Sequence, residues 1–206
     1  MTIFFYSVLE LDALEIINFP HPTLRHTSKP IVRVDAELRK IVTEMFDLMY
    51  KAKGIGLAAN QVGLPLQMFV INLAAEKGKG EEMVFINPVV SSPKGSAEAN
   101  EGCLSLAGIE AMVSRPDQIH VSAYNLAGET IDQSFKGFLA RVIQHEYDHI
   151  KGVMFIDRIS ESEKRLIEGE IEEFELEFEA ARAAGSIGSD EDINQYMKDI
   201  EKRYCI

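Results

Sequence analysis

The segment Gln144-His145-Glu146-Tyr147-Asp148-His149 determines how the rest of the chain is interpreted. Its two histidines are four residues apart, so on a helix they share one face, one turn from each other. That spacing lets both imidazoles reach one metal ion, with Glu146 close enough to touch a metal-bound water without being a ligand. A solvated helix face can carry the same letters, so the segment alone leaves both interpretations open.

A catalytic metal site needs a third protein ligand and an open fourth position. The helix does not supply that ligand, because His149 is the last histidine in the chain and the acidic residues beyond it are typical of a solvated helix. Upstream, Glu101-Gly102-Cys103-Leu104-Ser105 offers a thiol. A lone cysteine is more often a buried structural thiol, so Cys103 has two alternative roles at this point.

A third segment, Gly54-Ile55-Gly56-Leu57-Ala58-Ala59-Asn60-Gln61, carries closely spaced glycines. It is not a dinucleotide-binding fingerprint, since the third glycine is absent and a helix precedes it. It also lacks the Gly-Lys-Ser/Thr of a phosphate-binding loop. A plain helix-to-strand loop is one interpretation, and a loop that lets a substrate backbone approach is the other.

The three segments, in this order and at these separations, resemble the peptide deformylase family over roughly residues 14 to 160. The stretch Phe19-Pro20-His21-Pro22-Thr23-Leu24-Arg25 also resembles the family's opening. The resemblance implies an α+β fold in which mixed or antiparallel strands surround a central metal-bearing helix. We expect a catalytic domain over residues 1–160 and an acidic helical extension over 161–206.

Carried over to this chain, the resemblance implies that Cys103, His145 and His149 hold one divalent metal. Fe²⁺ is the expected ion, and Zn²⁺, Ni²⁺ or Co²⁺ can occupy such a site. A bound metal acidifies its water, and Glu146 would accept the proton and deliver it to the departing amine. The backbone N–H of Leu104 and the side-chain amide of Gln61 would stabilise the oxyanion. The reaction releases formate from the N-terminal formylmethionine of a newly made polypeptide.

The substrate of such an enzyme is an extended N-formylmethionyl peptide, which would bind beside the glycine loop through main-chain hydrogen bonds. The expected substrate-binding residues are Gly54, Ile55, Gly56, Gly102, Phe138 and Val142. Ordinary core packing is the alternative role for Phe138 and Val142. The segment Leu106-Ala107-Gly108 lacks a proline that many relatives have, and Glu110 stands where some carry arginine. The rim of the substrate site is therefore expected to differ.

Composition restricts the partners and the location. The net charge of −12 disfavours nucleic acid as a ligand. A length of 206 residues suits one sizeable domain. The two cysteines indicate a reducing compartment. We expect no membrane span, and residues 1–9 lack the basic start of a signal peptide. With a formylating translation system, these features favour the bacterial cytoplasm.

Hydrophobic spacing predicts the remaining elements. Strands are expected over 66–71, 83–86, 118–124 and 130–135, the second ended by Asn87-Pro88. Helices are expected from Asp35 to before Gly54, over 136–150, from about 161, and after a capping box of Ser189 and Asp192. The last two helices carry apolar stripes that either pack on the catalytic core or mediate self-association.

Two other functions compete with the deformylase interpretation. A metalloprotease shares the two histidines and Glu146, but it gives no ligand role to Cys103 and no role to Gln61. A binding module, a relative of the fold whose C-terminal helices engage a partner, would not depend on Glu146. The three segments together favour the deformylase.

Overall fold

The computed structural model describes residues 14–205, so the prediction about a signal peptide lies outside the described residues. The helices are α1 (Ala36–Lys51), α2 (Gly137–Ile150), α3 (Glu161–Ala183) and α4 (Asp190–Tyr204), with 3₁₀ turns η1 (Pro22–Arg25), η2 (Ala59–Val62) and η3 (Phe155–Asp157). The strands are β1 (Gly56–Ala58), β2 (Met68–Ile71), β3 (Met83–Lys94), β4 (Ala97–Cys103), β5 (Leu106–Arg115), β6 (Gln118–Tyr124) and β7 (Thr130–Lys136). The α+β prediction is confirmed.

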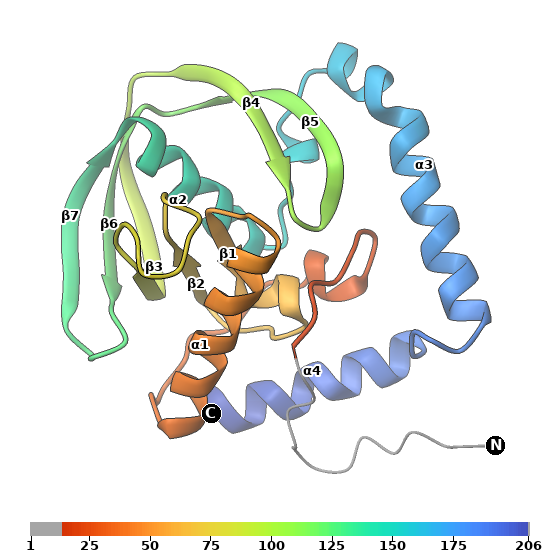
Figure 1. The fold of residues 1–206 in the computed structure, drawn as a ribbon, viewed down its shortest axis with the longest axis horizontal. Helices are drawn as coiled ribbons and strands as arrows, with labels where there is room; N and C mark the ends of the chain where they lie inside the picture. The colour runs from red at the N-terminus through yellow and green to blue at the C-terminus, as the bar shows by residue number, and fades with distance from the viewer. Residues whose placement is uncertain (1–13, 206) are drawn as a thin grey trace.

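Two antiparallel sheets enclose the central helix (Figure 1). The larger sheet has the order β1-β2-β3-β6-β7, and the smaller sheet is the β4–β5 hairpin. One face of α2 packs on the larger sheet through Ala140, Ile143 and Ile150, all fully buried. The opposite side of α2 meets the hairpin, where Arg141 donates to the carbonyl of Val113. The helix is therefore covered on both sides.

Strand β3 continues past Asn87-Pro88, so the predicted end of this strand is wrong. The register against β6 shifts between Ile86 and Val89, and Asn87 has a φ of 52°. The Asn87 side chain accepts from the Ile31 N–H and donates to the Ile31 carbonyl, at 2.7 Å each. These tertiary bonds hold an irregularity that lets the strand pass the proline.

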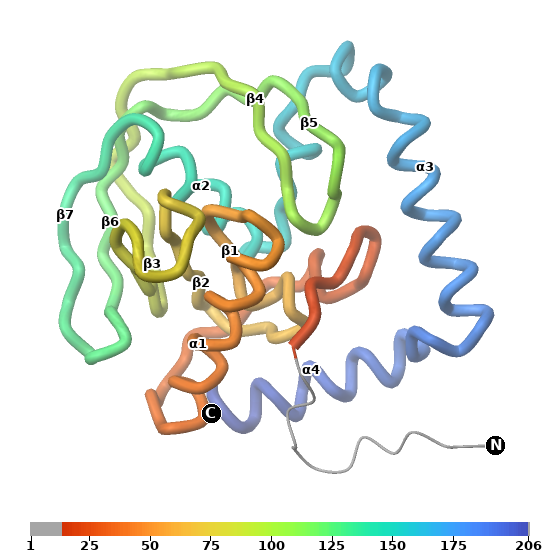
Figure 2. The backbone as a smooth tube through the Cα atoms, viewed as in Figure 1, coloured from red at the N-terminus to blue at the C-terminus, as the bar shows by residue number. Residues whose placement is uncertain are grey.

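The C-terminal helices begin as predicted and then pack on the rest of the chain. Ser160 caps α3, and Ser189 and Asp192 form the capping box of α4. In α4, Ile200 and Tyr204 are buried in the core that also contains α1 and β2. Figure 2 shows α4 running back along the body, with its C-terminal end near the start of α1. The stripe of α4 is therefore used within the chain.

Helix α3 buries fewer side chains than α4. Ile167 is buried in the cluster beneath the β4–β5 hairpin, whereas Leu166 and Leu176 are 73% and 70% exposed. None of the helices within residues 14–205 combines the length and the apolar character needed to cross a membrane.

Candidate active site

A thiol and two imidazoles converge where the end of β4 meets α2. One ligand atom from each of Cys103, His145 and His149 lies within 4.8 Å of the other two. Cys103 Sγ is 3.2 Å from His149 Nε2, which is 3.3 Å from His145 Nε2. Among residues 14–205 no second cluster of three histidine, cysteine or acidic ligand atoms is found. One sulfur and two nitrogens form a donor set suited to a divalent cation with an open position.

Burial and neighbours set the protonation of the two imidazoles. Burial and the charge of His145 hold the pKa of His149 well below its ordinary value, so this ring is neutral, as a ligand must be. Burial also lowers the pKa of His145, but hydrogen bonds with Cys103 and Glu101 outweigh it and raise the pKa to about 10. A cation that binds here therefore displaces a proton from His145.

Glu101 fixes the orientation of His145. Its Oε2 is 3.0 Å from His145 Nδ1, which leaves Nε2 facing the other ligands. Arg115 donates two hydrogen bonds to Glu101, at 2.6 and 2.7 Å, and Arg141 donates another at 2.6 Å. Burial alone would raise the pKa of Glu101, yet the hydrogen bonds and charges of His145 and Arg115 lower it to about 2. An ionised acceptor behind a metal-ligating histidine fixes the ring and its tautomer.

Asp148, on the same helix as His145, accepts a hydrogen bond from Arg115 at 2.6 Å. Asp148 also accepts two hydrogen bonds from Arg158, just after η3. Arg115 thus joins two carboxylates, one behind His145 and one on the same helix. This buried network ties α2, which carries His145 and His149, to the β4–β5 hairpin.

The carboxyl group of Glu146 is buried, and one of its oxygens is available to accept a hydrogen bond. The side chain is 4% exposed, and its Oε2 has no hydrogen-bond partner among the described residues. Burial, partly offset by the charges of His145 and Arg115, raises the pKa of Glu146 to about 7. A carboxyl group that titrates near neutrality can both accept and return a proton.

Gln61 reaches the cluster from η2. Its Oε1 accepts the Ala58 N–H at 2.8 Å, which directs Nε2 toward Cys103 Sγ, 3.4 Å away, and Ser105 Oγ, 3.2 Å away. The adjacent Asn60 donates to the carbonyl of His149. The loop is therefore joined to both ligand-bearing elements.

The glycines of this loop make room for the site. A Cβ at Gly56 would lie 2.4 Å from Glu146 Oε1, and one at Gly54 would lie 2.7 Å from Leu104 Cδ1. A larger residue at either position would therefore displace a side chain, that of Glu146 at Gly56 and that of Leu104 at Gly54.

The other predicted substrate-binding residues have mixed surroundings. Val142 is 5% exposed and packs in the core between α2 and the sheet, with Ile55 partly buried beside that core. Phe138 is 60% exposed in the first turn of α2, and Gly102 lies directly before Cys103 and opposite Glu110 of β5. Their roles toward substrate stay predictions.

Sequence reasoning assigned no role to Glu101, Ser105, Arg141 or Asn60, although three of them stand in the quoted motifs. Glu101 and Ser105 flank Cys103 at two residues' distance, and Arg141 precedes His145 by four, on the same helix face. Their closeness in sequence to Cys103 and His145 could have indicated that these residues belong to the site.

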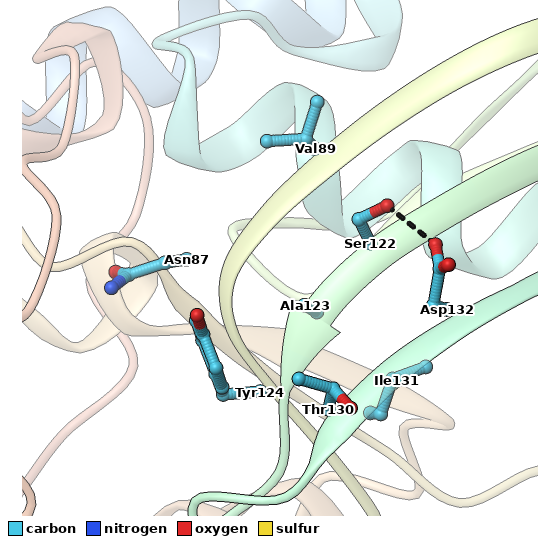
Figure 3. Close-up of a pocket in the computed structure, with 8 residues that line it drawn as sticks. All are labelled: Asn87, Val89, Ser122, Ala123, Tyr124, Thr130, Ile131 and Asp132. Atoms are coloured by element: carbon cyan, nitrogen blue, oxygen red, sulfur yellow. Dashed lines mark hydrogen bonds between the residues drawn. The ribbon is translucent and has the colours of Figure 1, made fainter.

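An open hollow lies elsewhere, on the outer face of β3, β6 and β7 (Figure 3). Its lining includes Val89, Tyr124 and Asp132, which accepts a hydrogen bond from Ser122. It contains none of the residues that the sequence predicted for the site.

Known proteins resemble this chain in sequence and in fold. A model of the polypeptide deformylase family matches residues 13–165. A peptide deformylase from Rhodopirellula baltica is 48% identical over 191 residues, which is 93% of this chain and 95% of that protein. The rice chloroplastic peptide deformylase 1B is 47% identical over 71% of this chain and 55% of its own length. A Plasmodium falciparum peptide deformylase crystal structure has a TM-score of 0.78 and 37% identity, covering 81% of this chain and 98% of that one. With this coverage and identity, the chain belongs to the peptide deformylase family, hydrolases that remove the N-formyl group from nascent polypeptides.

Proposed function

We propose that the deformylase activity of this chain resides in the cluster of Cys103, His145 and His149, which holds one divalent cation. The observation that carries the proposal is the convergence of their ligand atoms within 4.8 Å, beside the unpartnered carboxyl oxygen of Glu146. A bound cation supplies Lewis acidity, which polarises the formyl oxygen and acidifies water. A metalloprotease gives Cys103 no role, so the position of this thiol favours deformylation.

Glu146 is assigned the proton transfers. As a carboxylate it takes a proton from the water whose oxygen adds to the formyl carbon. It then delivers that proton to the amide nitrogen as the C–N bond breaks, which yields formate and a free amino group. A pKa of about 7 suits both halves of this task at neutral pH.

Gln61 and Leu104 are assigned the role of stabilising the negative charge that develops on the formyl oxygen. The Nε2 amide of Gln61 lies 3.4 Å from Cys103 Sγ, so it can donate to an oxygen placed beside the ligands. Leu104 follows Cys103 directly, and its backbone N–H is the second assigned donor. Fixed donors need no reorganisation when the charge forms, which lowers the barrier.

The peptide is assigned to the side of β1, the terminal strand of the five-stranded sheet. An extended chain can add to an edge strand through main-chain hydrogen bonds, with side-chain pockets giving specificity. Gly54, Ile55 and Gly56 lie on this strand or lead into it, and Gly102 lies beside the ligand Cys103. Phe138 and Val142 remain candidates for the methionine pocket.

The finer assignments are predictions as well. Fe²⁺ is the proposed cation; thiolate and imidazole ligands also suit Zn²⁺, Ni²⁺ and Co²⁺. We place the enzyme in the bacterial cytoplasm and keep residue 160 as the end of its catalytic region. Self-association through the C-terminal helices is assigned to α3, because Leu166 and Leu176 are exposed there.

The variant Glu146→Gln tests the proposal. The amide still forms hydrogen bonds but cannot accept a proton, so metal content should be retained while formate release falls about 100-fold or more. Glu177→Gln, at an exposed position of α3, is the matched control and should keep wild-type turnover. Wild-type turnover in Glu146→Gln would contradict the assignment.

A further inference from the structure

We propose that Ser105 is a positioning residue for this reaction, whose hydroxyl holds the Gln61 amide so that its second N–H faces the ligand cluster. The inference rests on the proposed role of Gln61. It adds a residue in the turn between β4 and β5 that is separate from the metal ligands.

Ser105 is fully buried and held from three sides. Its Oγ lies 3.2 Å from Gln61 Nε2, and its backbone N–H donates to Cys103 Sγ at 3.4 Å. Its carbonyl accepts the N–H of Phe19 at 2.9 Å. These two bonds fix the backbone of Ser105, so its hydroxyl can move only by rotation about the Cα–Cβ bond.

The hydrogen-bonding capacity of a primary amide explains why this matters. Gln61 Oε1 is occupied by the Ala58 N–H, which determines which end of the amide faces the cluster. Nε2 carries two hydrogens. When one of them is bonded to Ser105 Oγ, the other points toward the region of Cys103 Sγ, where an oxygen in reaction would lie.

Without the hydroxyl, the amide would have one acceptor fewer in a buried site. Gln61 is 2% exposed, so water does not readily replace the lost partner. An unsatisfied buried donor is costly, and the remaining acceptor within reach is the Cys103 sulfur. The amide would therefore no longer be held in the one orientation that points its second N–H at the reacting oxygen.

A double-mutant cycle separates positioning from simple packing. The variants are Ser105→Ala, Gln61→Leu and the two combined, assayed for kcat and KM on an N-formylmethionyl peptide, with metal content measured by mass spectrometry. Ser28→Ala is the matched control, because Ser28 is also buried and its hydroxyl has no partner among the described residues.

We expect Ser105→Ala to lower kcat about 10-fold, less than the ~100-fold loss expected for a deleted oxyanion donor, with KM and metal content unchanged. In the Gln61→Leu background, Ser105→Ala should cause no further loss, since there is no amide to position. Ser28→Ala should match the wild type.

Three results with Ser105→Ala would overturn the inference: wild-type kcat, an equal loss in both backgrounds, or loss of metal or fold. The last would assign Ser105 to the metal-bearing turn instead. If Gln61→Leu alone keeps full kcat, the proposed role of Gln61 fails and the inference fails with it. A slow Gln61→Leu with a fast Ser105→Ala rejects the Ser105 role only.

Discussion

Replacement of Gly56 by alanine should displace the carboxyl group of Glu146 without touching any metal ligand. An added Cβ would lie 2.4 Å from Glu146 Oε1, 2.8 Å from its Cδ and 3.0 Å from its Cγ. Gly56 lies in β1 and does not have a positive φ, so alanine suits the backbone there. The strain therefore falls on the side chain of Glu146.

The size of the effect follows from the required displacement. Moving the oxygen from 2.4 Å to 3.4 Å, where ordinary van der Waals contact begins, requires a shift of about 1 Å. A misplacement of ~1 Å in catalytic geometry can reduce a rate on the order of 100-fold. We therefore expect kcat of Gly56→Ala to fall about 100-fold, while the metal stays bound.

The assay is formate release under steady-state conditions, combined with metal content by mass spectrometry. Gly169→Ala is the matched control, because Gly169 lies within α3 and no atom of residues 14–205 lies within 4 Å of an added Cβ. It should keep full activity and stabilise the helix by up to about 1 kcal/mol. A fully active Gly56→Ala would refute the reasoning that Glu146 must lie against this strand.

Three further predictions follow from other contacts. Glu101→Gln removes the charge that orients His145, so metal affinity measured with a competing chelator should fall about 10- to 100-fold. The pKa of Glu201 is lowered because its hydrogen bonds with Lys29 and His26 outweigh burial, so its contribution to stability is present above its ordinary value of 4.5 and is lost at lower pH. Glu201→Gln should therefore lower the unfolding free energy by about 1–2 kcal/mol at pH 7, and the difference should vanish in acid denaturation curves as the pH falls below that value. Truncation after Gly188 removes the buried stripe of α4, so calorimetry should show a Tm about 10 °C lower, and an unchanged Tm would mean that the helix adds nothing to the core.

Local sequence was enough for elements whose signals are local. Asp35 and Ser189 cap α1 and α4 as predicted, because a cap depends on residues within one turn. The strands predicted over 118–124 and 130–135 match β6 and β7, which pair with each other in the structure. The passage of β3 through Asn87-Pro88 could not be predicted, since it depends on hydrogen bonds to Ile31, 56 residues away.

The β4–β5 hairpin was not predicted for a related reason. Strand β4 contains Ala97-Glu98-Ala99-Asn100-Glu101-Gly102-Cys103, whose residue types are weak strand formers. The hairpin is stabilised by the network of Glu101, Arg115 and Arg141, which forms only in the folded chain.

The candidate site shows the same division. The spacing of His145 and His149, with the motif of Cys103, predicted residues that the fold brings together. Helical spacing could not assign Val142, because α2 is buried on nearly every side and position on the helix no longer separates core from pocket. The partner of His145 could not be predicted either, because Glu101 lies 44 residues upstream of it.

The variants Cys103→Ala and Cys205→Ala together test directly whether Cys103 is a metal ligand on which deformylation depends. Cys205 is the C-cap of α4. Burial, together with the smaller effect of the Glu201 charge, raises the pKa of its thiol to about 11. Cys205 serves as the control thiol. Metal content and deformylation are measured together on each variant. We expect Cys103→Ala to lose the metal and the activity, because two histidines alone bind a cation weakly. Cys205→Ala should keep both. Stoichiometric metal and full deformylation in Cys103→Ala would contradict this expectation.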